Sequence, residues 1–149
     1  MATILTVLDA LVQFEENLRD LYVWLSDVYS RDPVASGTFY RLSLKEASHV
    51  NLVKYQRRLV HENAANLRYI EVDVSEIRQI LGGVREFRRR PDAPQLEEAL
   101  DFTIELEMAA AERVHTTATA HQDPGIETLM GRLAGDDRKH YEILKKAAR

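Results

Sequence analysis

Two short stretches of the sequence place a carboxylate and a histidine three residues apart: Glu46-x-x-His49 and Asp137-x-x-His140. On a helix, residues three apart lie on the same face, so each pair could bind a metal ion through a carboxylate oxygen and an imidazole nitrogen. Mixed carboxylate and imidazole ligands suit iron or manganese, while zinc or cobalt could occupy such a site adventitiously. One pair of this kind is common by chance on charged helices, so the surrounding pattern decides its meaning.

An internal repeat contains both pairs. Residues of the first half recur 91 positions later, with Asp32-Pro33, Arg41-Leu42, Glu46, His49 and Lys54 matching Asp123-Pro124, Arg132-Leu133, Asp137, His140 and Lys145. In the helices that precede them, Glu15 matches Glu107 at a spacing of 92. The chain therefore looks like one helical hairpin written twice.

The elements that position these residues are predicted to be four amphipathic helices, at about residues 3–30, 33–64, 95–121 and 124–148. The sequence has few glycines (6) and prolines (4). At two predicted starts, Asp32-Pro33 and Asp123-Pro124, an N-cap acceptor precedes a proline at the first helical position. The connection within each pair of helices is short, so each pair should form an antiparallel hairpin.

Residues 65–94 form a long connection between the two hairpins. Tyr69 to Val74 gives a weak hint of strand-like alternation, and Asp73-Val-Ser-Glu76 resembles a capping box, which predicts a short helix before Gly82-Gly83. A long connection between two hairpins indicates a crossover. The expected fold is therefore all-α, a four-helix bundle of two antiparallel hairpins joined by this crossover.

Each predicted helix has a mainly apolar core stripe that a carboxylate interrupts near its middle. The interrupting residues are Glu15, Glu46, Glu107 and Asp137, and His49 and His140 follow one turn after the second and fourth. At ~1.5 Å rise per residue, Glu15 lies about 25 Å from the first hairpin's turn and the Glu46/His49 pair about 24 Å. The mismatch in the second hairpin is roughly 4 Å, which is under one helical turn. All six groups should converge if the hairpins pack about a pseudo-twofold axis.

Four inward-facing carboxylates require positive charge nearby, because a buried ion without a partner is very costly. Arginine and lysine are missing from all four stripes. Two divalent cations would balance four carboxylates and two neutral imidazoles. The sequence therefore predicts a dinuclear metal site.

Composition limits the other function classes. A chain of 149 residues fits one domain, residues 1–149, and the absence of cysteine excludes disulfides, thiolate-held iron–sulfur sites and cysteine nucleophiles. No stretch approaches about 18 uncharged apolar residues and the N-terminus lacks a signal-peptide pattern, so a cytoplasmic protein without a membrane partner is expected. The net charge of −4 argues against a nucleic-acid partner. Arg85 and Arg88 to Arg90 are expected to be helix-end cations or the rim of a dimer.

At the metal-ligand residues the sequence resembles the ferritin-like di-iron carboxylate superfamily, whose ligand plan is one Glu from each of two helices and Glu-x-x-His from each of the other two. Within it, the sequence is similar to rubrerythrin-like domains, in Glu15-Glu16 followed by Leu21-Tyr22 and in Phe39-Tyr-Arg-Leu42 leading to Glu46-Ala-Ser-His49. The resemblance covers the four predicted helices and not residues 65–94. It implies a cytoplasmic protein that holds two iron ions, reacts with peroxide or O₂, and forms a homodimer.

The sequence departs from that family at three points. Without cysteine it lacks a rubredoxin-type iron centre, so the reductant would be a separate electron donor. Asp137 stands where the family has glutamate, and its shorter side chain could make a longer, monodentate or missing bridge. Val114 occupies the place that corresponds to Tyr22. Tyr22 itself could hydrogen-bond a ligand carboxylate, relay an electron, or be a core tyrosine with a satisfied hydroxyl.

Other residues that could do chemistry lie off the ligand level. His61, His115 and His121 are expected at the surface, Trp24 against the connection or a partner, and Met108 and Met130 in the core.

The expected function is reduction of peroxide or O₂ at a di-iron or di-manganese centre. In this interpretation Glu46 and Asp137 bridge the ions, Glu15 and Glu107 are terminal ligands, each histidine binds one ion, and Tyr22 is the candidate catalytic residue. One alternative is an iron-handling ferroxidase for storage or delivery, which would need a cage or a partner compartment. Another is a non-catalytic bundle with a vestigial metal site.

Overall fold

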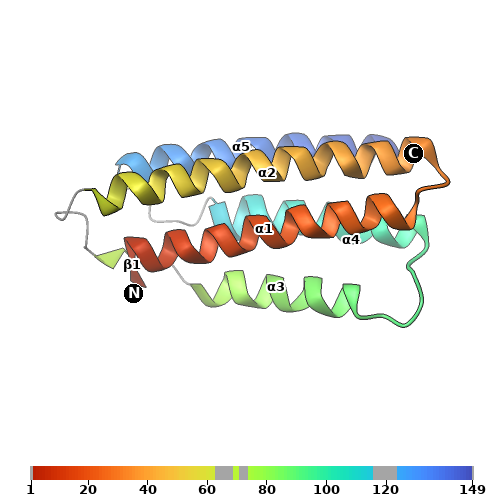
Figure 1. The fold of residues 1–149 in the computed structure, drawn as a ribbon, viewed down its shortest axis with the longest axis horizontal. Coiled ribbons are helices and arrows are strands. Elements are labelled where there is room, and N and C mark those ends of the chain that lie inside the picture. The colour runs from red at the N-terminus through yellow and green to blue at the C-terminus, as the bar shows by residue number, and fades with distance from the viewer. Residues whose placement is uncertain (1, 63–68, 71–73, 116–123, 149) are drawn as a thin grey trace.

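The computed structural model describes residues 2–62, 69–70, 74–115 and 124–148, and this part of the chain is almost entirely helical (Figure 1). The helices are α1 (Ile4–Val28), α2 (Pro33–His61), α3 (Val74–Arg88), α4 (Leu96–Ala109), a π-helical segment η2 (Ala110–His115) and α5 (Pro124–Ala147). Two strands of two residues each, β1 (Ala2–Thr3) and β2 (Tyr69–Ile70), pair in antiparallel register. The prediction of an all-α protein is confirmed, and no helix in the described part is long and apolar enough to cross a bilayer.

The start of α2 follows the predicted capping mechanism. The Asp32 carboxylate accepts hydrogen bonds from the backbone N–H groups of Val34 and Ala35, and Pro33 occupies the first turn, where its missing N–H costs nothing. The matching prediction at Asp123 lies outside the described residues. Thr3 caps α1 in the same way, accepting from the N–H of Thr6.

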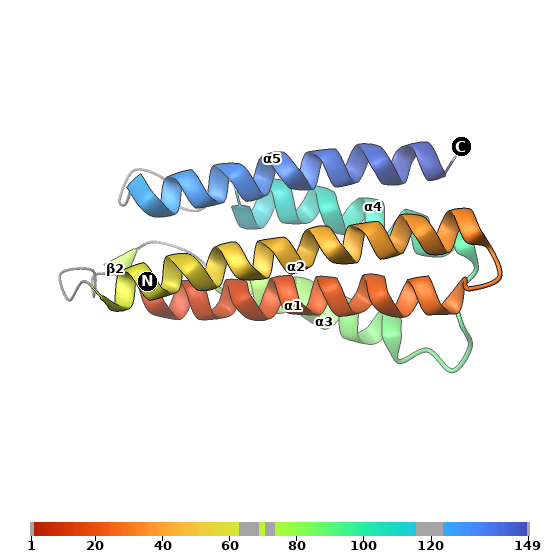
Figure 2. The ribbon, with the colours of Figure 1, turned by 45° about the horizontal axis from the view of Figure 1, so that its top comes forward.

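The long helices lie side by side, and the chain reverses direction from α1 to α2 and again from α4 to α5 (Figures 1 and 2). α1 packs along α2, α4 and η2 pack on α5, and α2 also contacts α5. At the end where α1 meets α2, the hydroxyl groups of Ser26 and Ser36 each donate to the other residue's backbone carbonyl. These contacts bring the middles of α1, α2, α4 and α5 to the same level.

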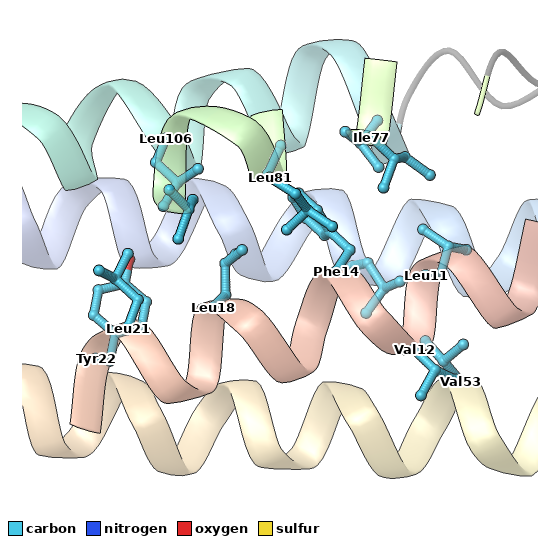
Figure 3. Packing of buried hydrophobic residues seen from close by; sticks show 14 of the residues in the cluster. Leu11, Val12, Phe14, Leu18, Leu21, Tyr22, Val53, Ile77, Leu81 and Leu106 are labelled. Carbon is cyan, nitrogen blue, oxygen red and sulfur yellow. The ribbon is translucent and has the colours of Figure 1, made fainter. Parts of the chain in front are cut away.

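α3 covers α1 and α4 on the side away from α2 and α5 (Figure 1). Its buried residues recur every three or four positions, and two of them, Ile77 and Leu81, lie over Phe14 of α1 (Figure 3). The expected stop before Gly82-Gly83 is wrong, because the helix continues through both glycines to Arg88. Burial of the α3 face beyond the glycines outweighs their low helix propensity of about 1 kcal/mol each.

Aromatic side chains fasten the end of α3 to its neighbours. The Phe87 ring stacks on Phe102 of α4 with centroids 4.0 Å apart, and meets Trp24 of α1 edge-on at 6.2 Å. The Arg88 guanidinium lies over the Trp24 ring, 5.6 Å from its centroid. Trp24 therefore packs against the connection, as predicted.

Met108 corrects the predicted core. Its side chain is 39% exposed, whereas Met130 is 2% exposed. Met108 directly follows Glu107, and one residue on a helix turns the side chain by about 100° away from the buried stripe.

Candidate metal centre

All six predicted metal ligands lie in the interior at one level of the structure. Glu15 comes from α1, Glu46 and His49 from α2, Glu107 from α4, and Asp137 and His140 from α5. The four carboxylate residues are 0% exposed and the two histidines 2%. Carboxylates this deeply buried are rare, and each requires compensation.

The six residues form two groups that share one member. Glu15, Glu46 and His49 make the first group, and Glu46, Glu107, Asp137 and His140 the second. Within each group the candidate ligand atoms all lie within 4.8 Å of one another. Metal–ligand bonds of about 2.1 Å separate opposite ligand atoms by about 4.2 Å, so each group is close to the size of a coordination sphere.

The two histidines present equivalent nitrogen atoms to the carboxylates. His49 Nδ1 lies 3.2 Å from Glu46 Oε2 and 3.5 Å from Glu15 Oε2. His140 Nδ1 lies 3.1 Å from Glu46 Oε1 and 3.5 Å from Glu107 Oε1. The two oxygens of Glu46 thus point to different histidines, and the imidazole rings stack with centroids 5.4 Å apart. This places Glu46 between the two groups, as a bridging carboxylate requires.

Several of these buried atoms have no hydrogen-bond partner among the described residues. They are both carboxylate oxygens of Glu46, Oε2 of Glu107, and Nδ1 of both histidines. A buried polar atom without a partner costs about 1–3 kcal/mol, and more when it is charged. Oxygen and nitrogen lone pairs converging without hydrogen bonds fit divalent cations of the iron and manganese class.

The electrostatics of the polypeptide alone show how strongly the cluster attracts positive charge. Burial, followed by the charges of Glu15 and Glu107, raises the pKa of Glu46 well above its ordinary value. Burial lowers the pKa of His49, but Glu15 and Glu46 more than compensate and raise it to about 12. Burial likewise lowers the pKa of His140, and Glu107 and Glu46 raise it to about 10. Protons and metal ions therefore compete for the same atoms.

Tyr22 is fully buried and its hydroxyl donates to Glu107 Oε1 at 2.5 Å. Burial raises the pKa of Tyr22 well above 10.0, and the Glu107 charge adds to this, so the phenol keeps its proton. Its ring stacks on Phe39 with centroids 6.2 Å apart. Of the roles left open by the sequence, the structure shows the hydrogen bond to a candidate ligand carboxylate.

Asp137 lies in the second group alone, so the geometry differs from the interpretation in which it bridges both ions. Its carboxylate is one methylene shorter than that of Glu46, the matching residue of the repeat. The shorter side chain accounts for its absence from the first group.

Asp136 is a further residue at the cluster that was not predicted from the sequence. One of its carboxylate oxygens, Oδ2, lies 3.1 Å from His49 Nε2, the ring nitrogen that faces away from Glu46. Asp136 lies one position off the core stripe of α5 and reaches a histidine of α2. The available signal was the Asp136-Asp137 doublet, in which the first residue occupies the repeat position of Lys45.

Two hollows in the surface adjoin the cluster. One, of about 210 Å³ between α2 and α5, is lined by His49 and His140 and by the cationic residues Lys45, Arg132 and Lys139. The other, of about 260 Å³ between α5 and the α4–η2 segment, is lined by Glu107. Both are large enough for water-sized molecules.

Comparison with known proteins adds no relative to this picture. No family model, curated protein or solved structure matches the chain. The functional interpretation therefore depends on the geometry of the site and on the resemblance in its ligand residues.

Proposed function

We propose that the protein is a dinuclear metal carboxylate protein that reduces peroxide or O₂, with two iron ions as its cofactor and manganese as the alternative metal. In this proposal α1, α2, α4 and α5 form a ferritin-like four-helix bundle of two hairpins. Glu15, Glu46 and His49 hold one ion, and Glu46, Glu107, Asp137 and His140 hold the other.

The position of Glu46 carries the proposal. Its two oxygens face different histidines, it belongs to both ligand groups, and neither oxygen has a hydrogen-bond partner among the described residues. A single ion in either group would leave the other group's carboxylates and histidine without a cation. Two divalent cations balance four carboxylates and two neutral imidazoles, and a shared carboxylate keeps the ions adjacent.

The residues around the cluster have separate tasks in this reaction. A reduced metal pair supplies two electrons to an oxidant when it is bound. Tyr22 holds a proton on the Glu107 carboxylate side of the cluster and fixes the orientation of that carboxylate. The surrounding apolar side chains exclude bulk water, and the two hollows beside the cluster offer space for a small oxidant such as peroxide or O₂.

The reductant in this proposal is a separate electron donor, because a chain without cysteine cannot hold an iron centre of the rubredoxin type. We also propose a homodimer.

Metal content tests the proposal directly. Protein reconstituted with Fe²⁺ without oxygen should contain about two iron ions per chain by elemental analysis. Added peroxide should then be consumed while a matching amount of Fe²⁺ is oxidised. Optical absorption follows this oxidation. One ion or none per chain would overturn the dinuclear assignment and favour a vestigial site.

Particle mass separates the proposed enzyme from an iron store. Light scattering should give a dimer, which cannot enclose a mineral core. A large closed assembly that takes up many iron ions per chain would instead favour the ferroxidase and storage function.

A further inference from the structure

The carboxylate of Asp136 links the two hairpins at the edge of the ligand cluster. Its Oδ2 lies 3.1 Å from His49 Nε2, and its Oδ1 lies 3.9 Å from the ammonium group of Lys139. His49 is 2% exposed, whereas the Asp136 side chain is 31% exposed in the wall of the hollow between α2 and α5. Asp136 is therefore a surface carboxylate that acts on a buried histidine.

The orientation of His49 defines what Asp136 can do. Nδ1 faces Glu15 and Glu46, so an ion bound with those carboxylates takes the Nδ1 lone pair, and the ring proton lies on Nε2. That N–H then donates to Asp136. A hydrogen bond of this kind fixes the tautomer and the ring orientation of a metal-binding histidine and makes its nitrogen a stronger donor.

The residue that matches Asp136 cannot support His140, the histidine that matches His49, in the same way. Lys45 occupies the position that matches Asp136, lines the same hollow as His140, and carries an ammonium group that cannot accept a hydrogen bond. The two groups also differ in size, with three candidate ligands in the Glu15 group and four in the other. The carboxylate therefore supports the group that has fewer ligands.

We infer that Asp136 is a positioning residue that orients His49 and strengthens binding of the ion held by Glu15, Glu46 and His49. The inference rests on the proposed dinuclear function. It assigns to a residue outside the ligand set the task of strengthening the group that has fewer candidate ligands among the described residues.

Anaerobic titration with Co²⁺, whose visible absorption reports its ligands, measures the two ions separately. Asp136→Ala should weaken binding of one ion by about 10–100-fold and leave the other unchanged. Asp136→Asn should recover part of the loss, because its amide oxygen still accepts from Nε2–H. Lys139→Ala, which removes the other neighbour of Asp136, is the matched control and should titrate like the wild type.

A double variant distinguishes positioning from a general structural effect. Glu15→Gln should already lose the ion of the first group, so adding Asp136→Ala should not change the affinity or the spectrum of the remaining Co²⁺. Weaker binding of that remaining ion in the double variant would overturn the inference. The inference would also be overturned if Asp136→Ala bound two Co²⁺ ions with the same affinities and spectrum as the wild type. Wild-type protein that binds fewer than two Co²⁺ would overturn the proposed function and this inference together.

Discussion

Glu46 offers the sharpest test of the dinuclear geometry, because it is the one candidate ligand found in both groups. Glu46→Gln keeps the size of the side chain and removes the charge. We expect this variant to lose both ions, whereas Glu15→Gln should lose one. In a protein with two independent mononuclear sites, each substitution would cost at most one ion.

The expected magnitude follows from linkage. At a free-ion concentration about 100 times the Kd, each bound ion stabilises the folded state by about 2.7 kcal/mol, so two ions contribute about 5.4 kcal/mol. For a domain of roughly this size, 1 kcal/mol shifts the Tm by about 2–4 °C. Saturating Mn²⁺ should therefore raise the Tm by roughly 11–22 °C in the wild type, by about half of that in Glu15→Gln, and hardly at all in Glu46→Gln.

The metal-free variants provide the reference for this comparison. Glu46→Gln keeps the shape of the side chain, so we expect it to fold. The Tm of each variant in chelator is the baseline for its own metal-dependent shift.

Calorimetry with and without Mn²⁺, combined with elemental analysis after gel filtration, measures both quantities on the same samples. Glu16→Gln is the matched control, since its side chain is the neighbour of Glu15 but 36% exposed. Equal metal-dependent shifts in Glu46→Gln and Glu15→Gln would refute the bridging role of Glu46, and full metal content in Glu46→Gln would refute its assignment as a ligand.

Three further predictions concern the charge, the phenol and the extra helix. The pKa values of His49 and His140 are raised from 6.5 to about 12 and about 10, so their contribution to the stability of the metal-free protein is fully present below pH 6.5. The Tm of the metal-free protein should therefore fall as the pH rises from 6.5 towards 10. A Tm in chelator that stays flat or rises over this range would contradict the assigned charges. Tyr22→Phe should keep two ions per chain but lower the free energy of unfolding in chelator by roughly 1.5–3 kcal/mol, because it loses the hydrogen bond to Glu107. An unchanged denaturation midpoint would show that this bond contributes little. Leu81→Ala should lower the free energy of unfolding, measured by urea denaturation, by about 2–5 kcal/mol, because Leu81 is 4% exposed in the core. A loss near that of a substitution at an exposed site would mean that α3 is only loosely attached.

The interior of the site was predictable because side-chain direction on a helix follows from spacing alone. Glu46 and His49 share a face whatever surrounds them, and the hairpin arithmetic needs only the rise per residue and the position of the Asp32-Pro33 start. These two local rules were enough to predict that all six candidate ligands lie at one level.

Features that depend on contacts between elements were not predictable in the same way. Asp136 lies off the core stripe, and only the packing of α5 against α2 brings it to His49. Gly82 and Gly83 favoured an end of the helix at that point, but burial of Val84 and Phe87 keeps α3 helical beyond them. The widening of the helix at Ala110, just after Glu107, has no signal in the hydrophobic period. In the first two cases a neighbouring helix decides the outcome.

Three differences between the two halves of the repeat fall on the candidate metal centre. Tyr22 is matched by Val114, Glu46 by Asp137, and Asp136 by Lys45. Tyr22 gives a phenol to the Glu107 carboxylate of the second group. The shorter Asp137 leaves Glu46 as the shared ligand, and Asp136 supports His49 of the first group. Unequal surroundings imply unequal ions, so a symmetric repeat has produced an asymmetric site. The two metal ions should therefore bind in sequence, and the order in which Glu15→Gln and Asp137→Ala remove the tight and the weak phase of a titration identifies which group fills first.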